Sequence, residues 1–193
     1  MKAAEALDLL GLAELADYPY NQLSGGQRQM ILMARAIAQE MKLPRERIDG
    51  LRMAAIIHDI GKVSVPSEIL SSPRKLTPLE FSLIKTHAQS GYDIVREIEF
   101  PWPIARIIIE HHERMDGSGY PNALTGDQIL PESRILAVAD VVEAMATHRP
   151  YRPSLGLEAA LDEITQNRGR LYDPEVVDAC LRLFREKDYT IRD

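Results

Sequence analysis

Apolar residues recur at intervals of three and four along most of this chain, which is the spacing of amphipathic helices. In the stretch 25–41 they fall at Met30, Ala34, Ile37 and Met41, and Ser24 is placed to cap the helix start. Similar spacing predicts further helices over 3–10, 46–60, 78–97, 102–112, 131–147, 155–167 and 174–186. No stretch alternates apolar and polar residues between turn signals, so the sequence predicts an all-helical fold.

Glycine and proline mark the expected boundaries between these helices. The first helix should end near Gly11, and the helix over 46–60 should stop at Gly61. Residues 63–78 form a connection rich in proline and serine, and residues 113–130 form a long loop that contains glycine.

Composition narrows the classes of function. The 193 residues carry a formal net charge of −6, which does not favour a nucleic acid polymer or an anionic membrane as partner. No apolar run is long enough to span a bilayer, and the N-terminus lacks the pattern of a signal peptide. Cys180 is the single cysteine and lies in an apolar helical pattern, so we expect a core residue and a cytoplasmic setting.

Polar residues interrupt several of the apolar helical stretches. An acid within such a stretch is costly to bury unless it is paired or bound to a metal. Imidazoles together with carboxylates suit iron, manganese or zinc. Each residue alone could be a satisfied core histidine or a helix cap, but the set together indicates a metal site: His58, Asp59, His87, His111, His112 and Asp140.

Three motifs connect these residues to a known family. They are HDIGK at 58–62, HHERMDGSGYP at 111–121 and ILAVADVVEAMATHRPYRP at 135–153. In this order they closely resemble the HD-GYP phosphodiesterases, a subgroup of the HD metal-dependent phosphohydrolases. The resemblance runs from about residue 35 to residue 187. It implies a helical bundle that holds two or three metals and hydrolyses cyclic di-GMP to the linear dinucleotide or to GMP.

The resemblance also implies roles for the candidate ligands. Asp59 would bridge two divalent ions, for which iron and manganese are the expected metals, and would thereby act in catalysis. The other ligands would divide between the ions, with His58 and Asp140 on the first and His87, His111 and His112 on the second. Paired ions of this kind activate water and hold phosphate oxygens during in-line attack.

A second set of positions would bind the dinucleotide. Lys62 would reach toward the scissile phosphate and offset its charge. The loop after the paired histidines would shape the site, together with two arginines that could equally be surface ion-pair residues. These positions are Asp116, Gly117, Gly119, Tyr120, Pro121, Arg149 and Arg152.

One expected ligand is missing. Proteins of this family place a further metal-binding histidine on the first helix of the domain, and counting back along the chain puts that position at Gly26. Some have an acidic ligand one turn earlier, where this chain has Gln22. No histidine occurs between Met1 and Ile57, so we expect the first metal site to be weak or empty.

A different resemblance occupies the place of that histidine. Residues 1–40 are similar to the helical subdomain of ABC transporter ATPases, with LSGGQ at 23–27 and ARAIAQE at 34–40. The chain has no G-x-x-x-x-G-K-[ST] sequence, so we expect no ATP hydrolysis. Our hypothesis is a chimera in which an ABC-like segment, residues 1–33, supplies the first helix of an HD-GYP-like domain over 34–193.

Three functional hypotheses follow. The first is a metal-dependent phosphodiesterase acting on cyclic di-GMP, impaired by the absent histidine. The second is a weakly active or inactive module that binds metal and a cyclic dinucleotide. The third is an engineered chimera with no evolved function. The sequence leaves the metal, the oligomeric state and the choice among cyclic dinucleotides open.

Overall fold

The computed structural model describes residues 24–147 and 154–190, and every regular element in these ranges is a helix. The only β-type pairing in them is two isolated bridges, Asp116 with Thr125 and Arg168 with Tyr172. The prediction of an all-helical fold is therefore confirmed. In chain order the elements are α2 (Gly25–Glu40), α3 (Arg45–Ile57), η3 (Ile60–Ser64), α4 (Ser67–Leu70), α5 (Pro78–Val95), α6 (Ile104–Glu110), η4 (Gly126–Gln128), α7 (Pro131–Ala146), α8 (Leu157–Gln166) and α9 (Pro174–Glu186).

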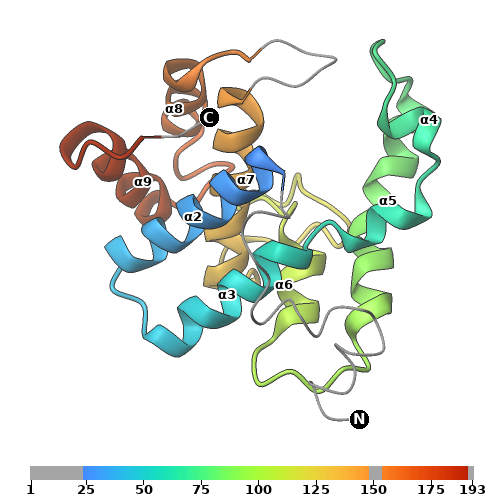
Figure 1. Cartoon of the computed structure of the whole chain (residues 1–193), viewed down its shortest axis with the longest axis horizontal. Coiled ribbons are helices and arrows are strands. Elements are labelled where there is room, and N and C mark those ends of the chain that lie inside the picture. Colours follow the sequence, from blue (N-terminus) through green and yellow to red (C-terminus); the bar gives the residue numbers. More distant parts are fainter. Residues whose placement is uncertain (1–23, 148–153, 191–193) are drawn as a thin grey trace.

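The hydrophobic core forms where α2 packs along α7 (Figure 1). The apolar face predicted for α2 points into this core, since Met30, Ala34 and Ile37 are each at most 2% exposed. α8 and α9 pack on one side of the pair, and α3 and α6 join it to α5 on the other (Figure 1). Cys180 is fully buried in α9, as predicted, and burial raises the pKa of its thiol to about 12.

Most helix boundaries agree with the sequence pattern. Ser24 caps α2 as predicted, because its side chain accepts a hydrogen bond from the Gln27 amide while the Gln27 side chain accepts one from the Ser24 amide. The connection over 63–78 contains one short helix, α4, which was not predicted because the proline and serine content of this segment indicated a loop. The helix predicted over 102–112 is shorter, because α6 spans only Ile104–Glu110. The predicted helix over 3–10 lies outside the described residues.

The predicted stop of the second helix at Gly61 is wrong. α3 already ends at Ile57, and the chain turns through the short helix η3. Gly61 serves a different purpose: a β-carbon added there would lie 2.0 Å from the carbonyl oxygen of His87 and 2.4 Å from the amide nitrogen of Gly91. The absence of a side chain thus allows the HDIGK turn to rest directly on the backbone of α5.

None of the described helices is both long enough and apolar enough to cross a membrane.

We predict that Gly61→Ala lowers the free energy of unfolding by about 1–3 kcal/mol, the usual cost of forcing an extra carbon into a packed site. Chemical denaturation of both proteins measures the difference. Gly25→Ala is the matched control, because a β-carbon at Gly25 has no neighbour within 4 Å. Equal stability of the Gly61 and Gly25 variants would contradict the close approach of η3 to α5.

Candidate metal centre

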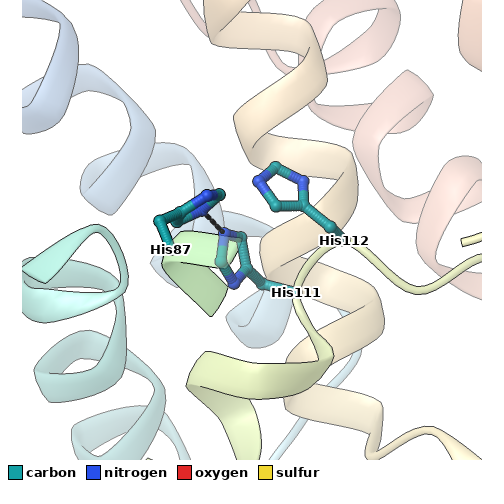
Figure 2. A group of neighbouring side chains, drawn as sticks. All are labelled: His87, His111 and His112. Atoms are coloured by element: carbon teal, nitrogen blue, oxygen red, sulfur yellow. Dashed lines mark hydrogen bonds between the residues drawn. The ribbon is translucent and has the colours of Figure 1, made fainter. Parts of the chain in front are cut away.

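Helix ends deliver most of the predicted ligands to one place. His58 directly follows α3, Asp59 precedes η3, and His111 directly follows α6, with His112 next to it. His87 differs, because it lies in the interior of α5 and faces the core. Figure 2 shows the rings from α5 and from the end of α6 turned toward one another.

The structure brings five of the six predicted ligands into two overlapping groups. The first group is His58, Asp59 and His111, and the second is His87, His111 and His112. Within each group the potential ligand atoms all lie within 4.8 Å of one another. Because His111 belongs to both groups, the two sets of donors form one continuous cluster.

The hydrogen bonds of the rings fit a cation at this cluster. The Nδ1 atoms of His58, His87 and His111 each face the backbone carbonyl three residues earlier, at 2.8, 2.7 and 2.5 Å. A carbonyl only accepts hydrogen bonds, so Nδ1 carries the proton, and in a neutral ring Nε2 keeps its lone pair. The Nε2 atoms of His87 and His111 then face each other at 3.4 Å with no proton between them (Figure 2). A positive ion between these lone pairs would satisfy both.

Burial keeps the paired histidines uncharged. It holds the pKa of His111 and of His112 well below the ordinary value, and the neighbouring imidazoles add to this effect. Burial likewise lowers the pKa of His87. These rings are therefore neutral near pH 7, which is the state that binds a metal.

Asp59 belongs to the first group and also lies close to His87 of the second. One carboxylate oxygen is 3.4 Å from His58 Nε2, and the other is 3.5 Å from His87 Nε2. Burial opposes the charge on this carboxylate, but the attraction of His58 and Lys62 outweighs it and holds the pKa of Asp59 far below its usual range. For His58 burial also opposes the charge, yet Asp59 and Asp140 raise its pKa overall. The Lys62 ammonium is 2.6 Å from Asp59, with its side chain 38% exposed.

The first predicted site is less complete than the second. Asp140 belongs to neither donor group, although it is half-buried on α7 and its charge acts on the pKa of His58. Gly26 on α2, where the family's histidine would stand, faces the buried Glu143 on α7, the helix that also carries Asp140. A β-carbon at Gly26 would lie only 2.2 Å from a carboxylate oxygen of Glu143.

The predicted substrate loop runs back against the centre. The ring of Tyr120 is 4.7 Å from the ring of His112, and burial raises the pKa of Tyr120. A β-carbon at Gly119 would lie 2.4 Å from the Cα atom of Glu113, so the loop passes very close to the end of the histidine segment. Gly117 takes a positive φ of 79°, and Asp116 accepts a hydrogen bond from the Ser118 amide at 3.0 Å. Pro121 follows Tyr120 through a cis peptide bond.

Sequence reasoning missed Glu113, the residue that fastens this loop. The residue is 2% exposed, and its carboxylate accepts hydrogen bonds from the backbone amides of Asn122 at 2.7 Å and Leu124 at 3.0 Å. The only available signal was an acid directly after the paired histidines. Of the other predicted substrate residues, Arg149 and Arg152 lie outside the described part of the chain.

Comparisons with known proteins agree with this geometry. A family model described as HD domain matches residues 12–176. The chain is 40% identical over 173 residues to the cyclic di-GMP phosphodiesterase response regulator RpfG of Xanthomonas campestris, covering 89% of this chain and 46% of the relative. It is 38% identical over 184 residues to a cyclic di-GMP phosphodiesterase of Thermotoga maritima, covering 94% and 50%. The chain thus spans about half the length of these curated relatives.

A solved structure shares the fold. The crystal structure of a cyclic GMP-AMP specific phosphodiesterase of Vibrio cholerae, V-cGAP3, superposes with a TM-score of 0.65 at 18% identity, covering 97% of this chain and 50% of that one. At this identity the likeness concerns the fold alone. The chain belongs to the HD domain family, and its cyclic di-GMP phosphodiesterase relatives support its place in the HD-GYP subgroup.

Proposed function

We propose that this chain is a metal-dependent phosphodiesterase domain that hydrolyses cyclic di-GMP in the cytoplasm. The observation that carries the proposal is the pair of donor groups that share His111, with the two oxygens of Asp59 directed at histidines of different groups. Two adjacent cation positions joined by one carboxylate match the requirement for cleaving a phosphodiester by in-line displacement.

Within this proposal the roles follow the two groups. Asp59 would be the ligand common to two divalent ions, iron or manganese, which when bound would supply activation of water and neutralisation of phosphate charge. His87, His111 and His112 would hold the second ion, and His58 and Asp140 would hold the first. All of these side chains lie on packed helices or directly at their ends, which keeps their geometry fixed before substrate arrives.

Lys62 acts on the substrate in this proposal. Its ammonium lies 2.6 Å from Asp59, and the side chain is partly exposed to solvent. A bound phosphate oxygen could therefore replace Asp59 as its partner after only a small movement of the side chain. The loop Asp116–Pro121 borders the same centre through Tyr120 and would hold the nucleotide. Arg149 and Arg152 stay proposed substrate ligands on sequence alone.

The choice of cyclic dinucleotide is part of the proposal. The two relatives described above are named for cyclic di-GMP, whereas the solved structure with the same fold is named for cyclic GMP-AMP. The sequence identities to the first two, 40% and 38%, favour cyclic di-GMP. Competition between the two nucleotides in one assay would decide between them.

A binding module is the second candidate, and Gly26 favours it. Without a histidine at this position the first ion loses a protein ligand, and the buried Glu143 carboxylate occupies the space next to the glycine. A chain that binds one ion tightly and the other weakly would bind the dinucleotide and turn it over slowly.

The origin of the first helix stays a separate proposal. We infer that residues 1–33 derive from an ABC-type segment joined to the domain over 34–193. The HD domain match begins at residue 12 and so includes most of that segment, which speaks against a separate origin for residues 12–33. Within the described part of the chain, α2 packs along α7 and contributes to the hydrophobic core. A helix taken from another protein would have to make the same contacts.

The decisive assay is cyclic di-GMP turnover by purified protein, loaded with iron under anaerobic conditions or with manganese in air. We expect linear dinucleotide or GMP as product, resolved by chromatography. Folded, metal-loaded protein that binds the nucleotide without product would favour the binding module instead.

We predict that Asp59→Ala reduces the metal content of both positions and lowers turnover by at least about 10–100-fold, the range seen when residues supporting a metal ligand are lost. Elemental analysis after dialysis measures the metal. Asp93→Ala is the matched control, because Asp93 is an exposed acid on α5 outside both donor groups. Normal metal content in the Asp59 variant would rule out its bridging role.

We also predict that Gly26→His raises metal content once the Glu143 carboxylate is removed, because a side chain at 26 would otherwise overlap it. The comparison is therefore between Glu143→Ala alone and Glu143→Ala with Gly26→His. More metal per chain in the double variant is expected. If both variants fold and bind equal metal, position 26 does not face the first site.

A further inference from the structure

The first half of α5 presents an aromatic ring and a cation beside the metal centre. Phe81 and Lys85 lie one turn apart on this helix, N-terminal to His87. Residues four apart on a helix share a face, and here the Lys85 ammonium lies 5.0 Å from the centre of the Phe81 ring. Phe81 is 47% exposed, so part of its surface is open to a ligand beside Lys85.

These two side chains connect to the centre through the substrate loop. The Lys85 ammonium lies 5.1 Å from the centre of the Tyr120 ring, and the Tyr120 ring lies 4.7 Å from that of His112. The rings of Tyr120 and His112 are inclined by only 30°, so they are nearly stacked. The side chains of His112, Tyr120, Lys85 and Phe81 therefore form a continuous row of contacts. This row of rings leads from a candidate metal ligand to the surface.

The chemistry of this row matches a nucleotide rather than a protein partner. Within the described part of the chain, the contacts of the Lys85 ammonium are with two rings and not with a carboxylate, so its charge is available to an anion. Exposed aromatic rings next to cations are the usual platform for nucleobases and phosphates.

The spacing also suits a nucleotide. With a helical rise of 1.5 Å per residue, Phe81 lies about 9 Å along α5 from His87. This separation is on the scale of one nucleotide, from a phosphate at the histidine cluster to its base.

We propose that Phe81 and Lys85 form a subsite in which the Phe81 ring stacks on a purine base and the Lys85 ammonium binds a phosphate. The proposal rests on the proposed function, because it places the scissile phosphate of the same nucleotide at the histidine cluster. It assigns to α5 a substrate-binding face besides the ligand His87.

The test is equilibrium binding of GMP and of ribose 5-phosphate to the manganese-loaded protein, by calorimetry. Phe81→Ala should raise the Kd for GMP by roughly 5- to 100-fold, the usual effect of losing one base–aromatic stack. It should leave ribose 5-phosphate binding unchanged, because that ligand has no base. Lys85→Met, which keeps an apolar stem but removes the charge, should weaken binding of both ligands.

Leu79→Ala is the matched control, since Leu79 is 72% exposed on the same helix and takes no part in the row of rings. Equal GMP affinity of wild type and Phe81→Ala, or no GMP binding by the wild type, would overturn the subsite. Cyclic di-GMP hydrolysis by the wild type in the same preparation would leave the proposed function standing in either case. Weakened GMP binding without any hydrolysis would support the subsite and count against the enzyme.

Discussion

The central constraint on this molecule is the burial of several imidazoles in one small volume with their lone pairs facing inward. His87 and His111 direct the Nδ1 proton to a backbone carbonyl of their own segment, so their Nε2 atoms face each other without a proton between them. Such an arrangement is unfavourable in a dry interior unless positive charge lies among the rings. Positive charge at this cluster would offset that cost, and the packed helices that carry the rings hold their donor atoms together.

Backbone proximity maintains this space as much as side-chain packing does. The turn that carries Asp59 rests on α5 where Gly61 lacks a side chain, and this contact sets the distance between Asp59 and His87. Side chains of a long helix and of a tight turn could shift relative to each other, but two backbones in contact have little freedom. Gly61, which has no side chain, therefore contributes to the rigidity of the metal centre.

The sequence predicted what depends on local pattern. Periodic apolar residues were sufficient for α2 and its cap at Ser24, and interrupted apolar stretches were sufficient to find the histidines. Contacts between distant segments were not predictable in this way. Gly61 looked like a helix stop because the same residue type serves both purposes, and the place of Glu143 beside Gly26 follows only from how α2 packs on α7. Glu113 was overlooked because an acid beside two histidines reads as part of the metal motif.

Glu113 has one more consequence for how such a domain can change over time. It fastens the loop from the inside, through backbone amides rather than through the loop's own side chains. The rest of the loop takes its shape from Gly117, with its positive φ, and from the hydrogen bond of the Ser118 amide to Asp116. Under the proposed function, substitutions at loop positions outside these contacts can alter which nucleotide is accepted while the frame beside His112 persists, so selectivity and architecture can evolve separately here.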